Sequence, residues 1–190
     1  MKKNTFKIGI PIISLIILTF IASHYYPDWI KYRERKNKAQ LLVSYYTNKP
    51  MYLPFYENDS ISQEDFDQYY RNQPLKIVDY LNGDCSMCFD KLDFWKKFLN
   101  DLALNHCKIP ILIYSNSFCK EQLLENINGM WPYPWIFDEK NQFLKDNELI
   151  DPLYQTMLLD KDNKVLIIGN PRHNDALKSL YIKTIQQYHP

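Results

Sequence analysis

The sequence predicts an α/β fold, in which helices form a sandwich around a mixed sheet. From residue 74 onward, segments with strand character alternate with segments that have helical periodicity. The chain then closes with a two-stranded hairpin and an amphipathic helix. Hydrophobic residues make up 46% of the 190 residues and charged ones 24%, with only 4 glycines, which favours a packed globular body over a disordered chain.

The expected elements follow from runs bounded by turn residues and from apolar residues at helical spacing. The strands are predicted at 75–81, 108–116, 133–139, 154–160 and 164–169. The helices are predicted at 62–72, 85–104, 117–128, 140–149 and 173–188. The turn Lys161-Asp162-Asn163 joins the last two strands, and the aromatic cluster 130–137 is expected to pack in the core rather than line a groove for polypeptide.

The N-terminus has the pattern of a membrane anchor or an export signal. About 16 uncharged residues (8–23) are preceded by basic residues and followed by aromatic ones: Lys2, Lys3, Lys7, Tyr25, Tyr26 and Trp29. The run is short for a free-standing span of roughly 20 residues, but aromatic side chains at the membrane interface can extend it. We therefore expect an uncleaved anchor, with a cleaved signal and a soluble helix as the alternatives.

Three regions follow from this reading: an anchor or signal segment at 1–28, a stalk and lead-in at 29–73, and the folded domain at 74–190. Basic residues also follow the apolar run, which weakens the charge argument for orientation. The expectation that the domain faces the extracytoplasmic space therefore depends partly on its cysteines. The net charge of +1 provides no basic field for nucleic acid, so nucleic acid is not an expected partner.

Cys85 and Cys88 are the strongest candidates for chemistry, because they lie two residues apart where an apolar run gives way to a helical pattern. The turn sequence Asn82-Gly83-Asp84 places Cys85 at the start of the helix and Cys88 one turn later. The unpaired N–H groups of a first helical turn stabilise a thiolate, so we expect Cys85 to be the nucleophile and Cys88 the resolving thiol. A purely structural disulfide and a pair of metal ligands are the alternatives.

The other two cysteines, Cys107 and Cys119, are expected to be buried small side chains, with a second disulfide as the alternative. Cys107 precedes a predicted strand, and Cys119 opens a helix beyond the other end of that strand. Opposite strand ends do not converge, so no metal site is predicted. His106 and His173 are expected at the surface.

The order strand, CxxC, helix, strand, helix and strand, with a closing hairpin and helix, resembles the thioredoxin fold over residues 74–188. The hairpin "TMLLDKDNKVLIIGNP" is similar to the T-F-L-I-D-x-D-G-K pattern of membrane-tethered, outward-facing TlpA-type reductases and their redoxin relatives. The resemblance implies a thioredoxin-like three-layer α/β/α sandwich preceded by a transmembrane helix. It also implies thiol–disulfide exchange without a cofactor.

The sequence departs from this family pattern at two positions. Asp84 stands before the first cysteine, where the family has an apolar residue, and its charge should oppose thiolate formation at Cys85 and favour a reductant over a strong oxidant. Tyr154 occupies the position of the family's cis-proline. The resemblance assigns Tyr154 and Gln155 to the loop that offers backbone groups to a bound partner peptide.

Asp79, in the strand that leads to the cysteines, is a candidate for proton transfer, because a buried carboxylate nearby assists the resolving thiol in several thioredoxins. A surface-facing position in the strand would explain Asp79 equally well.

These observations favour a membrane-anchored, extracytoplasmic thiol–disulfide oxidoreductase that reduces or exchanges disulfides in exported cysteine-containing proteins. A membrane electron donor would reduce it again. The alternative is a non-catalytic thioredoxin-like binding or assembly module in which a CxxC disulfide only locks the start of the helix.

Overall fold

The computed structural model describes residues 6–56, 61–104 and 106–188, and it describes only the backbone of residues 6–18, 21, 22, 87 and 173. The chain divides into two compact units, Met1–Tyr45 and Tyr46–Pro190. Each unit is described by itself below.

The described part of the first unit is helix α1 (Phe6–Tyr46), which is 41 residues long and whose last residue belongs to the second unit. Residues 1–5 of the expected anchor lie outside the described residues, as do most side chains of the apolar run 8–23. Within the part of the chain that the structure describes, no helix is both long enough and apolar enough to cross a membrane.

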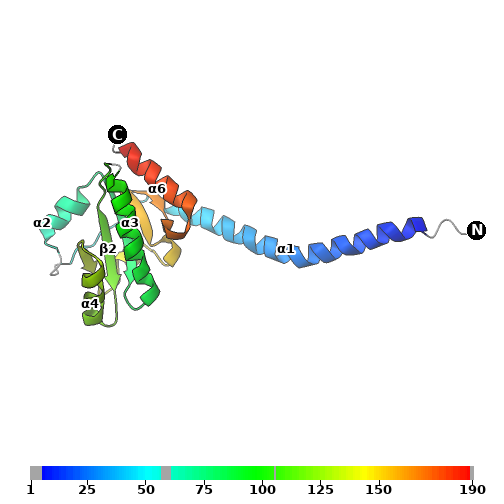
Figure 1. The fold of residues 1–190 in the computed structure, drawn as a ribbon, viewed down its shortest axis with the longest axis horizontal. Coiled ribbons are helices and arrows are strands. Elements are labelled where there is room, and N and C mark those ends of the chain that lie inside the picture. The colour runs from blue at the N-terminus through cyan, green and yellow to red at the C-terminus, as the bar shows by residue number, and fades with distance from the viewer. Residues whose placement is uncertain (1–5, 57–60, 105, 189–190) are drawn as a thin grey trace, which may run out of the picture. The chain divides into compact units, whose positions relative to one another are not determined.

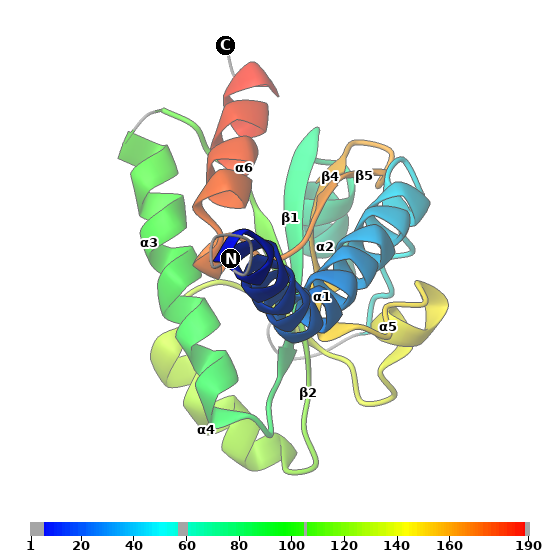
Figure 2. The same cartoon turned by 90° about the vertical axis from the view of Figure 1, so that its right-hand side faces the viewer.

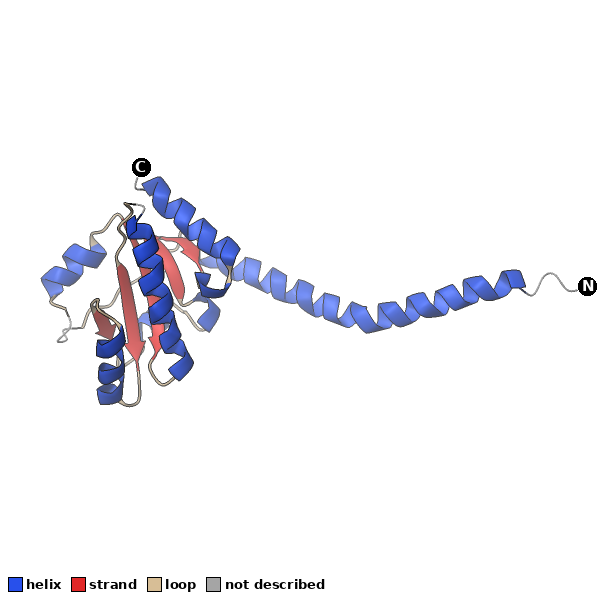
Figure 3. Cartoon of the chain, in the orientation of Figure 1, coloured by secondary structure: helices blue, strands red, loops and turns tan. Residues whose placement is uncertain are grey.

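The second unit is built on a five-stranded mixed sheet with the order β3-β2-β1-β4-β5 (Figures 1 and 3). The strands are β1 (Leu75–Asn82), β2 (Ile111–Asn116), β3 (Trp135–Phe137), β4 (Thr156–Asp160) and β5 (Val165–Ile168). β1, β2 and β3 are parallel, whereas β4 is antiparallel to both β1 and β5. β2, β3, β4 and β5 fall within the predicted segments and β1 extends one residue beyond its own, which confirms the mixed sheet.

Four strands are shorter than the sequence predicts, and a proline explains the late start of two of them. β2 begins directly after Pro110 and β3 directly after Pro134. Proline has no N–H group to give to a ladder of strand hydrogen bonds, so it ends regular pairing.

Helices cover both faces of the sheet, which confirms the predicted layered α/β architecture (Figure 2). One face carries α3 (Asp90–Leu104), α4 (Lys120–Met130) and α6 (Asp175–Tyr188). The other carries α2 (Gln63–Phe66) and α5 (Gln142–Asp146).

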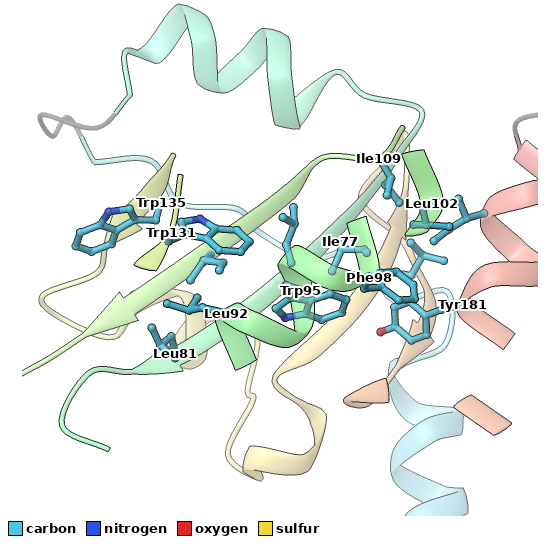
Figure 4. Close-up of a cluster of buried hydrophobic side chains, with 14 of the residues drawn as sticks. Ile77, Leu81, Leu92, Trp95, Phe98, Leu102, Ile109, Trp131, Trp135 and Tyr181 are labelled. Carbon is cyan, nitrogen blue, oxygen red and sulfur yellow. The ribbon is translucent and has the colours of Figure 1, made fainter. Parts of the chain in front are cut away.

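The main hydrophobic core lies between the sheet and the layer of α3, α4 and α6 (Figure 4). Trp95 and Phe98 of α3 are buried there, and Tyr181 of α6 joins them. Trp131 and Trp135 are buried in the same cluster, so the predicted core role of the aromatic segment is confirmed for these two residues. A continuous buried apolar cluster of this kind is the main source of stability for the domain.

Residues 46–56 and 61–73, part of the segment that the sequence predicts as stalk and lead-in, belong to the same compact unit as the rest of the domain. They lie against the second face of the sheet, where the Tyr114 hydroxyl donates to the Pro54 carbonyl at 2.7 Å and the Tyr114 ring stacks on Phe143 with 4.4 Å between centroids. The lead-in also pairs with the edge strand β5. The Asn48 N–H donates to the Val165 carbonyl at 2.9 Å, and the Val165 N–H donates to the Lys49 carbonyl at 3.1 Å.

Candidate functional site

The two cysteines follow the carboxyl end of β1, beside the end of the neighbouring parallel strand β2. The Gly83 N–H donates to the Asn116 carbonyl at 2.7 Å, which ties the two strand ends together. A β-carbon at residue 83 would lie 2.7 Å from the Leu123 side chain and 2.9 Å from the Asn116 carbonyl oxygen. Only glycine fits this close approach, so the turn sequence before Cys85 has a packing reason.

The α-helix begins later than the sequence predicts. Residues Ser86–Phe89 form a 3₁₀ turn, and α3 starts at Asp90 instead of Cys85. Such turns are common at helix N-termini, where backbone groups lack partners within the helix. Cys85 is extended (φ −109°, ψ 102°), and its carbonyl accepts the Cys88 N–H at 2.9 Å.

This turn brings the two sulfurs together, because side chains three residues apart nearly eclipse each other in 3₁₀ geometry. Cys85 and Cys88 are both half-buried thiols, and they lie close enough together for Cys85 to raise the pKa of Cys88. The predicted pairing of the two cysteines in space is therefore present.

The environment of Cys88 keeps its thiol protonated at neutral pH. Burial raises the pKa of Cys88 to about 11, and the neighbouring Cys85 adds to this shift. Lys91 acts in the opposite direction, and Asp79 adds a smaller increase to the pKa. A thiol with a raised pKa is a poor first nucleophile.

Asp79 is buried, with 1% of its surface exposed, so the surface-facing alternative is wrong. Its carboxylate accepts three hydrogen bonds: from Lys91 Nζ at 2.9 Å, from the Trp95 indole N–H at 2.8 Å and from the Thr156 hydroxyl at 2.6 Å. The carboxylate lies beneath the cysteine turn, close enough to influence Cys88.

Sequence reasoning did not include Lys91 or Thr156 in the site. The spacing of Lys91, three residues after Cys88, is a signal that could have found it. Thr156 could be placed only by the pairing of β1 with β4, in which Asp79 lies opposite Thr156.

Asp84 connects the cysteine loop to the loop that follows β2. Its carboxylate accepts the Ser117 hydroxyl at 2.7 Å and the Phe118 N–H at 3.0 Å. The expected effect of Asp84 on the acidity of Cys85 remains a prediction, but its structural role as a link between loops is visible.

Tyr154 and Gln155 directly precede β4, at the end of the sheet where β1 leads into the cysteine turn. Tyr154 ends the short 3₁₀ turn Pro152–Tyr154 and is half-buried. The Gln155 carbonyl accepts the Tyr80 N–H at 3.1 Å, and the Gln155 side chain donates to the Leu149 carbonyl at 3.2 Å. All peptide bonds between described residues are trans. The loop therefore lies beside the end of β1, as the resemblance implies, but the Gln155 carbonyl and side chain already have partners within the domain.

The remaining cysteines are placed differently from each other. Cys107 is buried, as predicted, but Cys119 is exposed, so the expectation of a buried side chain is wrong there. Cys119 directly precedes α4, in the loop that Asp84 holds. No three His, Cys, Asp or Glu side chains gather as metal ligands among the described residues. His106 is exposed, and the His173 side chain lies outside the described residues.

An open pocket of about 450 Å³ lies on the α4 side of the cysteine turn. Gly83, Ser86 and Ser117 line it, together with Leu123. Phe118, next to this pocket in sequence, is fully exposed. The sequence analysis did not find this surface, because it is formed by two loops that are distant along the chain.

Comparisons with protein-family models and with curated proteins found no match. Solved structures do resemble the chain. A candidate thioredoxin from Neisseria meningitidis has a TM-score of 0.51 at 14% identity, over 74% of this chain and 91% of that chain. A thiol:disulfide interchange protein from Bacteroides sp. has a TM-score of 0.49 at 18% identity, covering 66% of this chain and 79% of that one. The thioredoxin domain of a thiol-disulfide oxidoreductase from Bacteroides vulgatus has a TM-score of 0.48 at 19% identity, covering 66% of this chain and 85% of that one.

The sheet order, the helix layers and the Neisseria structure together define the domain as a thioredoxin-like fold. Its candidate site is a pair of adjacent thiols at the start of a helix.

Proposed function

We propose that the chain is a thiol–disulfide oxidoreductase that uses Cys85 and Cys88 to reduce or exchange disulfides in other proteins. The observation that carries this proposal is the 3₁₀ turn, which holds two thiols close together beyond the end of β1. The difference between the two thiols gives each a role. Cys88 is kept protonated by its surroundings, so Cys85 attacks first and Cys88 resolves.

The reaction has two steps. The Cys85 thiolate attacks one sulfur of a partner disulfide, so that a Cys85–partner bond forms and the other partner sulfur leaves as a thiolate. Cys88 then loses its proton and attacks Cys85, which forms the Cys85–Cys88 disulfide and releases the second partner thiolate. The partner gains two electrons, and the Cys85–Cys88 pair loses two. Asp79, buried beneath the turn, is the proposed acceptor of the Cys88 proton, and Asp84 beside Cys85 favours the reducing direction.

The loop at Tyr154 and Gln155 is the proposed contact for the partner polypeptide. It lies at the same end of the sheet as the cysteines, because the Gln155 carbonyl accepts the Tyr80 N–H near the end of β1. No cofactor is needed, since the electrons pass between sulfur atoms.

We place the domain on the extracytoplasmic side of a membrane, held by residues 1–28 as an uncleaved anchor. The uncharged run 8–23 and the aromatic residues after it support this placement. The partners would then be exported cysteine-containing proteins and a membrane electron donor. An impermeant maleimide tests the location in intact cells: the exposed Cys119 should be labelled before lysis, and labelling only after lysis would place the domain inside.

A trapping experiment tests the reaction. In a full-length Cys119→Ser background, which removes the exposed thiol, Cys88→Ser should accumulate mixed disulfides through Cys85. The matched Cys85→Ser variant should trap nothing. If Cys88→Ser also traps nothing, the chain is better described as a non-catalytic binding or assembly module, which Asp84 and Tyr154 favour, with Cys85–Cys88 as a structural disulfide.

A further inference from the structure

Lys91 occupies an unusual place for a lysine. Only 16% of its side chain is exposed, and it lies in the first turn of α3. A cation at a helix N-terminus is unfavourable, because the helix dipole is positive there. Lysine is also among the residues least often buried. Neither helix stability nor solubility explains this position.

The ammonium group of Lys91 is held in place by two acceptors on β1. Nζ donates to Asp79 Oδ1 at 2.9 Å and to the Tyr80 carbonyl at 2.9 Å. Asp79 is itself held by Trp95 from α3 and by Thr156 from β4. The positive charge is therefore fixed at the base of the cysteine turn, three residues after Cys88 and on the same side of the helix.

We propose that Lys91 is a positioning residue for the resolving step, whose fixed charge stabilises the thiolate of Cys88 as it attacks the Cys85–partner disulfide. This inference rests on the proposed function. In this step the Cys88 S–H bond breaks, and its proton passes to solvent by way of Asp79, the acceptor proposed above. The Cys85–Cys88 bond then forms as the Cys85–partner bond breaks, and the partner departs as a thiolate.

The charges around Cys88 explain why the resolving step needs the Lys91 ammonium group. Burial and the neighbouring Cys85 hold the pKa of Cys88 high, and Asp79 also raises it. Lys91 is a cation that lowers the pKa of Cys88, and its ion pair with Asp79 also compensates the negative charge of that carboxylate. Removing the Lys91 charge therefore destabilises the Cys88 thiolate in two ways. The attraction between Lys91 and the thiolate is lost, and the negative charge of Asp79 is no longer compensated.

The resolving step can be measured directly with dithiobisnitrobenzoate. In the full-length Cys119→Ser background, Cys85 releases one coloured thiolate when it attacks the reagent, and Cys88 releases a second when it resolves. Stopped-flow absorbance gives both rates across a range of about pH 6 to 10. The variants are Lys91→Met, Lys91→Gln and Lys91→Arg, with Lys97→Met as a matched control, because Lys97 is exposed on the same helix.

We expect Lys91→Met and Lys91→Gln to slow the second release about tenfold throughout this pH range, which lies below the Cys88 pKa, with the first release little changed. Lys91→Arg keeps the charge and should retain the rate, and Lys97→Met should behave as the wild type. Lys91→Gln can still donate to Asp79, so it separates charge from hydrogen bonding.

A second release by Lys91→Gln that is as fast as that of Lys97→Met throughout the pH range would overturn the inference. So would a slow Lys91→Arg variant whose thermal unfolding matches the wild type, since charge would then not be the determinant. A wild-type protein that releases only one equivalent would instead contradict the proposed function itself, which separates the two failures.

Discussion

Replacing Gly83 by alanine should destabilise the domain, because the loop before Cys85 leaves no room for a β-carbon. The added Cβ would lie 2.7 Å from Leu123 Cδ1, 2.9 Å from the Asn116 carbonyl oxygen and 2.9 Å from Ser117 Cβ. The leucine side chain can rotate, but the Asn116 carbonyl is fixed by the strand end and by its 2.7 Å hydrogen bond from Gly83. We expect a loss of about 1–3 kcal/mol in unfolding free energy, the usual cost of overpacking.

Urea unfolding of the full-length protein, followed by near-ultraviolet circular dichroism, measures this loss through the buried tryptophans of the domain. Gly129→Ala is the matched control, since its added Cβ meets nothing within 4 Å and alanine is favoured over glycine in the last turn of α4 by up to about 1 kcal/mol. The Gly83→Ala midpoint should fall while the Gly129→Ala midpoint rises. A Gly83→Ala midpoint equal to the wild type would refute the claim that the two loops require glycine.

Three further outcomes are expected. Trp95→Phe removes a buried donor to Asp79 and should lower the unfolding free energy by about 1–3 kcal/mol, measurable by urea unfolding; an unchanged midpoint would show that the bond contributes nothing. Burial lowers the pKa of Lys76 from 10.5 to about 8, so between these values the unfolded chain binds more protons and stability rises with pH. The advantage of the wild type over Lys76→Met should therefore grow across that window, and a flat difference would contradict the argument. In the native protein, iodoacetamide should modify the exposed Cys119 well before the buried Cys107, as read by mass spectrometry; equal rates would contradict the assigned exposures.

The strands and the layered architecture could be predicted because their signals are local. The apolar run of β1 and the turn between β4 and β5 need no information from the rest of the chain. The predicted starts of β2 and β3 are too early, because the prediction did not take into account that Pro110 and Pro134 have no N–H group for strand pairing.

The candidate site was predicted in part, for the same physical reason. Cys85 and Cys88 are close in sequence, so their proximity in space follows from a single turn. The partners of Asp79 come from different elements, and Thr156 is 77 residues away, so only the sheet register reveals the contact.

The exposure of Cys119 depends on a contact of the same kind. Cysteine is usually buried, and no local pattern indicated otherwise. Its loop is held by Asp84, which is 34 residues from Phe118 in the sequence. Long-range hydrogen bonds of this type are not visible in periodicity or composition.

The pairing of residues 48 and 49 with β5 has a consequence for anyone who expresses this domain alone. A fragment that begins at residue 74 would leave the last strand with unpaired backbone groups, which recruit strands from other molecules. It would also uncover the aromatic face around Tyr114. Such a fragment should aggregate, whereas one that begins at Tyr46 keeps the segment that covers the outer side of β5.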